Sequence, residues 1–175
     1  MHSAFTVEDL LALEVRNLYA AEKRPTRVLS RMHLGSRNPT LKSAFEDHSA
    51  ETDQQVRRLE DIAGMLQFAP AGGQCEGMDG CVREADAAFE IDEDDPMLDP
   101  RVIGAGIRIE HCEIARYITA IGLARQLKAV DAAALLEHSR AEEHRMQVAL
   151  CAISSALPRC VQAPQLRRAV LVRMQ

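Results

Sequence analysis

Two carboxylates stand inside an apolar helical pattern in the segment Ile109–Tyr117. Glu110 and Glu113 are three residues apart, and apolar residues around them recur at the three- and four-residue intervals of one helix face. Glu110 occupies the position on that face that falls between Ile107 and Ile114. An ionised carboxylate without a partner is costly in a protein core. The segment therefore predicts a carboxylate that is protonated, paired with a cation or bound to a metal ion.

Three other segments also place acidic residues on or beside an apolar stripe. They contain Glu22, the pair His48 and Glu51, and the adjacent residues Glu142 and Glu143. The number of residues from each turn gives the height of a side chain along the bundle. By this count Glu22 and Glu51 lie at nearly the same height. The heights of Glu113 and Glu143 differ by about 5 Å at 1.5 Å per residue. The sequence thus predicts acidic side chains from four long helices near the middle of a bundle.

Carboxylates that converge in a core repel one another unless a cation neutralises them. Oxygen ligands with one imidazole suit iron or manganese, and two divalent ions bridged by glutamates would balance the charge. The order His48-x-x-Glu51 is the reverse of the Glu-x-x-His common in di-iron bundles, and Met146 stands where a second histidine could follow Glu143. Each residue alone has an ordinary surface or hydrogen-bonding interpretation, whereas their shared depth favours a metal site.

Four long helical patterns are marked by capping and breaking residues. They occupy residues 6–35, 38–70, 99–128 and 131–158. The first three begin at Thr6, with Asp9 three residues later, at Asn38-Pro39 and at Asp99-Pro100. Pro25 lies inside the first pattern and should kink it. Short turns should pair the helices into two antiparallel hairpins.

The stretch between the two hairpins, residues 69–99, is about thirty residues long. It contains a short amphipathic piece at residues 78–89 and an acidic run at residues 92–95, which we expect to be a solvated loop. One long crossover between two hairpins is the ferritin-like topology. We therefore predict an all-α, ferritin-like four-helix bundle over residues 1–157. The basic tail at 158–175 could be a docking helix, a dimer contact or disordered.

Composition supports a helical protein. The 175 residues are 47% hydrophobic but only 3% aromatic, without tryptophan, which argues against a core built on a sheet.

The formal charge of -5 gives no reason to expect nucleic acid or an anionic membrane as partner. With no leader pattern and no apolar run of about 18 residues, we expect a cytoplasmic protein. The five cysteines lack metal-site spacing, so we expect reduced, mostly structural thiols.

Several blocks of the sequence resemble the YciE/YciF-like stress proteins of the ferritin-like superfamily. The blocks are residues 18–23, His48-x-x-Glu51-Thr52, Cys75-x-x-Met78-x-Gly80, Glu84-Ala85 and Glu110-His111-x-Glu113-Ile114-Ala115-x-Tyr117. The last block is the most specific and is also similar to a rubrerythrin motif. The resemblance implies a di-metal site with Glu22, Glu51, Glu110, Glu113 and Glu143 as carboxylate ligands and His48 as nitrogen ligand. Apolar spacing on the fourth helix favours Glu143 over Glu142.

The family resemblance implies a stress-response protein with ferroxidase activity. The leading hypothesis is a di-iron ferroxidase or peroxide-consuming protein, with O₂ or H₂O₂ as oxidant and Tyr19 or Tyr117 near the metals; manganese is the alternative metal. A non-catalytic, partner-binding bundle and a dimanganese catalase-like activity are the competing hypotheses. A homodimer is expected from the resemblance and because the short crossover helix should offer a second apolar face.

Overall fold

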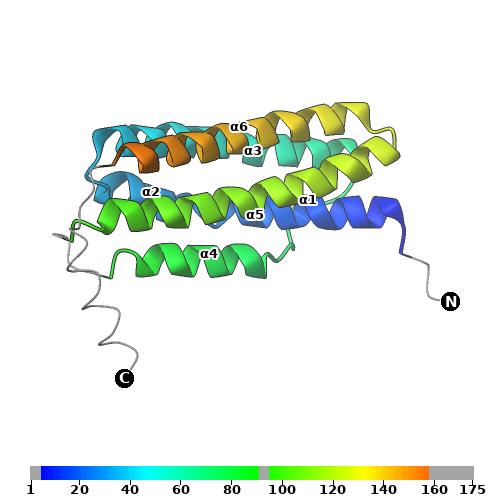
Figure 1. Cartoon of the computed structure of the whole chain (residues 1–175). Helices are drawn as coiled ribbons and strands as arrows, with labels where there is room; N and C mark the ends of the chain where they lie inside the picture. The colour runs from blue at the N-terminus through cyan, green and yellow to red at the C-terminus, as the bar shows by residue number, and fades with distance from the viewer. Residues whose placement is uncertain (1–4, 91–94, 158–175) are drawn as a thin grey trace, which may run out of the picture.

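The structure, a computed structural model, describes residues 5–90 and 95–157, in which helices are joined by loops and no strand occurs (Figure 1). Its helices are α1 (Val7–Lys23), α2 (Thr26–Gly35), α3 (Pro39–Met65), α4 (Glu76–Ala87), α5 (Leu98–Gln126) and α6 (Val130–Ala156). The predicted acidic run falls mostly outside the described residues, and the basic tail falls wholly outside them.

Two antiparallel hairpins make up the bundle (Figure 1). Helices α1 and α2 follow one another along the bundle and together pack antiparallel to α3, and α5 packs antiparallel to α6. The chain between the hairpins returns along the bundle through α4, which packs on α5. This arrangement confirms the predicted ferritin-like topology with one long crossover.

Two of the predicted helix starts have the expected capping bonds. The Asp9 N–H donates to Thr6 Oγ1 at 3.1 Å, and the Thr6 N–H donates to Asp9 Oδ2 at 2.9 Å, which forms a capping box. Asn38 Oδ1 accepts from the N–H groups of Thr40 and Leu41 at 2.9 and 3.2 Å. These side chains satisfy backbone donors that the first helical turn leaves open.

The first predicted helix is two helices rather than one kinked helix. Pro25 separates α1 from α2 because its ring has no N–H and clashes with the preceding turn. The cap predicted at Asp99 was wrong, since α5 already begins at Leu98. The Asp99 carboxylate instead accepts from the N–H groups of Arg37 and Asn38 at 2.8 and 2.9 Å. It therefore ties the start of α5 to the turn between α2 and α3.

The core consists of two hydrophobic clusters with a polar layer between them. Phe45, Ile109 and Met146 belong to one cluster, and Leu59, Tyr117 and Leu136 belong to the other. On each helix the residues between these positions include buried polar side chains. The polar layer therefore crosses the bundle and is closed at both ends by apolar packing. None of the helices in the described ranges combines the length and the hydropathy needed to cross a membrane.

Candidate metal centre

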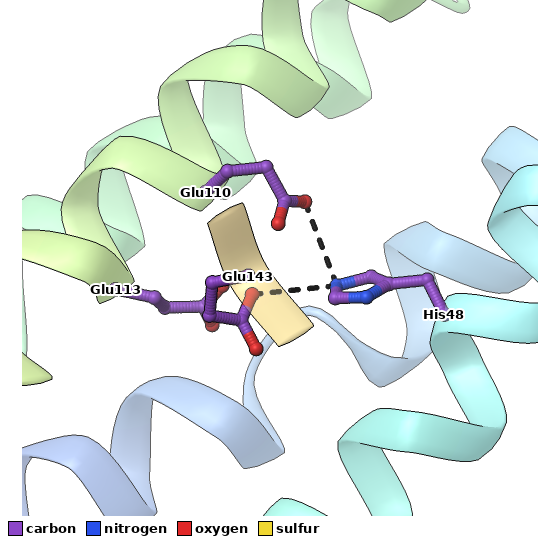
Figure 2. A group of neighbouring side chains, drawn as sticks. All are labelled: His48, Glu110, Glu113 and Glu143. Carbon is purple, nitrogen blue, oxygen red and sulfur yellow. Dashed lines mark ion pairs between the residues drawn. The ribbon is translucent and has the colours of Figure 1, made fainter. Parts of the chain in front are cut away.

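Four buried side chains face one another inside the polar layer (Figure 2). His48 comes from α3, Glu110 and Glu113 from α5, and Glu143 from α6. His48 Nε2 lies 3.5 Å from Glu110 Oε1 and 3.6 Å from Glu143 Oε2. One ligand atom from each of the four residues lies within 4.8 Å of the others. The cluster thus brings three carboxylates and an imidazole around one small volume.

Several buried side-chain atoms in the cluster and beside it have no hydrogen-bond partner within the described part of the chain. They are both carboxylate oxygens of Glu110, one oxygen each of Glu113 and Glu143, Nδ1 of His48 and the side-chain oxygen of Gln55. A buried polar atom without a partner costs about 1–3 kcal/mol. Such atoms are uncommon in folded proteins and call for a specific explanation. A bound divalent cation fits, because carboxylate and imidazole donors are the ligands that iron and manganese prefer.

Burial controls the protonation of these carboxyl groups. It raises the pKa of Glu110 and Glu113 well above the usual range, and the neighbouring carboxylates add to the effect. Burial also raises the pKa of Glu143, against the opposing influence of His48. Without a cation the cluster therefore retains protons that carboxyl groups in water would lose. A divalent cation can replace those protons and supply the missing positive charge.

Glu22 of α1 lies beside this cluster and is also buried. Its Oε1 accepts a hydrogen bond from the Tyr117 hydroxyl at 2.6 Å. Burial, followed by the charge of Glu143, raises the pKa of Glu22 well above the usual range. Glu22 is in turn the neighbouring charge with the largest influence on Glu113. Glu22, a fourth predicted carboxylate, thus shares the electrostatic environment of the four clustered residues.

Glu51 occupies the rim of the site. Its side chain is 33% exposed, and its Oε1 accepts from Arg145 at 2.9 Å. The other oxygen, Oε2, lies 3.6 Å from His48 Nδ1. The adjacent His48 and, after it, Arg145 lower the pKa of Glu51. Of the six residues predicted as ligands, Glu51 is the one that the structure places outside the buried group.

Glu142 is buried, although an adjacent acidic pair usually forms a solvated face. Arg58 Nη2 donates to Glu142 Oε1 at 2.7 Å, and Gln55 Nε2 donates to Glu142 Oε2 at 3.2 Å. Gln55 Nε2 also donates to Glu143 Oε1. Neither Gln55 nor Arg58 was predicted as part of the site. Gln55 could have been found from its spacing, because it follows His48 by seven residues on the buried stripe of α3.

The fold and the polar layer together define a ferritin-like bundle with a buried carboxylate and histidine cluster. The chain belongs to the YciF-like family: residues 6–163 match the family described as "Domain of unknown function (DUF892)". It is 32% identical to Protein YciF of Escherichia coli over 146 residues, which cover 83% of this chain and 88% of that protein.

Several solved structures have the same fold as this chain. The crystal structure of the E. coli stress protein YciF matches with a TM-score of 0.81 and 31% identity, covering 85% of this chain and 94% of that one. YcfI from Rhodopseudomonas palustris matches with a TM-score of 0.79 and 33% identity, covering 86% and 97%. A protein from Xanthomonas campestris, at 24% identity and a TM-score of 0.70, covers 86% and 93% and shows the fold alone.

Proposed function

We propose that the protein is a di-metal carboxylate protein of the stress response, with two iron ions in the buried cluster and manganese as the alternative. The observation that carries this proposal is the set of buried carboxylate oxygens without hydrogen-bond partners on Glu110, Glu113 and Glu143, among the described residues. The stress link comes from the E. coli relative, whose crystal structure is described as that of a stress protein.

His48, Glu110 and Glu143 would hold metal at one side of the cluster, and Glu113 with Glu22 would extend the site towards Tyr117. Bound Fe(II) would supply electrons for the reduction of O₂ or H₂O₂, which is ferroxidase or peroxide-consuming chemistry. The hydrophobic clusters on either side close the two ends of the polar layer. Tyr117 keeps its hydroxyl proton, because burial raises its pKa, and donates it in the bond to Glu22.

A homodimer and a cytoplasmic location remain part of the proposal, and the homodimer rests on the resemblance to the YciE/YciF-like family. The other reason, a second apolar face on the crossover helix, was wrong. Within the described residues, no large apolar side chain of α4 is exposed, and the outward positions of this helix include Arg83 and Glu84. The mass of the protein in solution at micromolar concentration tests the dimer directly, and a monomeric mass would contradict it.

Metal-induced stabilisation tests the site. Fe(II) without oxygen, or Mn(II), should raise the melting temperature of the metal-free protein by about 5–10 °C at a hundred times the dissociation constant. Glu110→Gln combined with Glu113→Gln should abolish most of this rise and leave the metal-free fold as stable or more stable, since the folded chain no longer holds two carboxyl groups whose ionisation burial opposes. Glu46→Gln combined with Asp53→Asn, which neutralises two exposed carboxylates, is the matched control and should keep the full response.

Two further measurements separate binding from catalysis. Elemental analysis of protein purified without added metal identifies the resident ion. Oxidation of Fe(II) faster than its autoxidation would support the ferroxidase, whereas oxygen release from H₂O₂ by manganese-loaded protein would indicate catalase-like chemistry. Metal stabilisation with neither activity would indicate a non-catalytic bundle. An unchanged melting-temperature rise in the double variant would refute the proposed ligands.

A further inference from the structure

A second reactive cluster lies outside the carboxylate site, where α1, α4 and α5 meet. Cys75 directly precedes α4, and its Sγ accepts a hydrogen bond from Nε of Arg116 on α5 at 3.0 Å. Arg116 is held in turn by Glu14 of α1, whose Oε2 lies 3.3 Å from Nη1. A guanidinium that donates to sulfur stabilises the thiolate form of cysteine over the thiol.

Cys112 completes this cluster from α5. Its Sγ lies against the first turn of α4, 3.6 Å from where a Cβ would stand on Gly77. The Cys112 thiol, as a hydrogen-bond donor, is the largest influence that lowers the pKa of Cys75 to about 6, and the Met78 N–H and Arg116 act in the same direction. The pair therefore combines a sulfur on Cys75 whose thiolate form is favoured with a neighbouring thiol on Cys112.

The chain before Cys75 is fixed against α1. The Gln74 N–H donates to Asn17 Oδ1 at 3.2 Å, and a Cβ on Gly73 would overlap the Arg16 carbonyl oxygen at 2.0 Å. Only glycine permits this approach, which holds the crossover on the backbone of α1. Cys75 itself is 2% exposed, whereas Cys112 is partly exposed. The pair therefore borders solvent at Cys112.

Cys81 is also close but is oriented differently. Its Sγ donates to the Arg108 carbonyl oxygen at 3.7 Å, and burial raises its pKa. The four cysteines in the described residues are free thiols. The cluster thus offers one activated sulfur, Cys75, and one adjacent sulfur able to react with it, Cys112.

We propose that Cys75 and Cys112 form a redox-active dithiol that is oxidised by peroxides and closes to a disulfide between the start of α4 and the middle of α5. Sequence spacing predicted only structural thiols, because the two cysteines are far apart in the chain and Arg116 is not near Cys75 in sequence. The proposal does not use a metal ion and goes beyond the function proposed for the carboxylate cluster.

The reaction has two steps. The Cys75 thiolate attacks one oxygen of the peroxide, a sulfur–oxygen bond forms, and the oxygen–oxygen bond breaks; the leaving oxygen takes a proton and departs as water or an alcohol. Cys75 is then a sulfenic acid. Cys112 attacks this sulfur, the disulfide forms, the sulfur–oxygen bond breaks, and the hydroxyl leaves as water with the Cys112 proton. Two thiols are oxidised, one peroxide is reduced, and an external thiol can restore the pair.

The test uses reduced, chelator-treated, full-length protein and equimolar H₂O₂. Intact mass should show the loss of two hydrogen atoms, and a non-reducing peptide map should link Cys75 to Cys112. In Cys112→Ser the Cys75 sulfenic acid should persist and be trapped by dimedone. Cys81→Ser is the matched control, since this thiol lies on α4 close to the same cluster, and this variant should form the same linked peptide.

The variant Arg116→Gln distinguishes activation from a purely structural contact. Loss of the guanidinium should raise the pKa of Cys75 above about 6, so oxidation should slow clearly at pH 6 and hardly change at pH 8, where the thiolate form prevails in both proteins. Circular dichroism checks that the variant is folded. An equal slowing at both pH values would show that Arg116 does not activate the sulfur.

The peptide map of the wild-type chain is decisive even if a variant fails to fold. A disulfide between other cysteines, or no disulfide, would overturn the dithiol. The combined Glu110→Gln and Glu113→Gln variant should still form the linked peptide, because the reaction does not need metal. A protein that binds metal without forming the disulfide would refute the dithiol alone, and the reverse result would refute the metal site alone.

Discussion

The Tyr117 hydroxyl donates a 2.6 Å hydrogen bond to Glu22 Oε1, which joins α5 to α1 inside the core. Both side chains are buried, with relative exposures of 0% and 1%. Burial raises the pKa of both groups, so the phenol keeps its proton, and its hydrogen bond favours the ionised form of Glu22. The bond links the two hairpins at the edge of the carboxylate cluster and fixes the position of Glu22.

Tyr117→Phe should lower the free energy of unfolding of the metal-free protein by about 1–3 kcal/mol, because a buried carboxyl oxygen loses its donor. Urea denaturation measures this change. Tyr19→Phe is the matched control: its hydroxyl donates to Glu60 Oε1 at 2.9 Å near the surface, so its loss should cost no more than about 0.5 kcal/mol. Equal costs for the two variants would contradict a structural role specific to Tyr117.

Arg58 and Glu142 form a largely buried ion pair beside the cluster, with side-chain exposures of 13% and 6%. Glu142→Gln should destabilise the metal-free protein by about 2–4 kcal/mol, because Arg58 loses its counter-ion. Arg58→Met in the same chain should recover part of that loss. The metal-induced rise in melting temperature should persist in the double variant, since neither residue is among the proposed ligands. Additive costs in this double-mutant cycle would show that the pair is not coupled.

The raised pKa values of Glu110 and Glu113 predict a pH dependence for the metal-free protein. Above about pH 4.5 the unfolded chain loses these protons while the folded chain keeps them, so stability falls as pH rises towards the folded-state pKa. The loss can reach about 1.4 kcal/mol per pH unit for each group. The combined Glu110→Gln and Glu113→Gln variant lacks these protons in both states, so its stability advantage should grow with pH.

Urea denaturation at pH 5, 6.5 and 8 in the presence of a chelator measures this difference. Using the difference between the two proteins removes the contributions of all other titrating groups that they share. A constant difference across this range would mean that the two carboxyl groups titrate normally in the folded protein.

Periodicity was enough to predict the buried carboxylates. Glu110 had to face the core because it completes an apolar stripe, and the count of residues from the turns placed Glu22 level with Glu51 and Glu113 near the height of Glu143. The topology followed from unequal connection lengths. These features depend on the regular rise and twist of a helix, which the sequence of a single segment already determines.

Partners from other helices could not be predicted in this way. Glu142 and Glu143 both lie near the apolar stripe of α6, and the burial of Glu142 depends on Arg58 of α3, which spacing within α6 does not reveal. The contact of Asp99 with the turn before α3 is another example, since a favourable capping residue serves a tertiary hydrogen bond instead. Such choices are decided by packing between helices.

Glu51 provides the sharpest test of the predicted ligand set. Because its carboxylate is partly exposed and bound to Arg145, binding metal would require it to give up a favourable ion pair. Glu51→Gln should therefore weaken Mn(II) binding by less than about tenfold, whereas Glu113→Gln, at a buried position with an unpaired oxygen, should weaken it by more. Isothermal titration calorimetry measures both affinities, with Glu46→Gln as an exposed control on the same helix as Glu51. Equal losses in Glu51→Gln and Glu113→Gln would show that Glu51 turns from Arg145 into the cluster when metal binds.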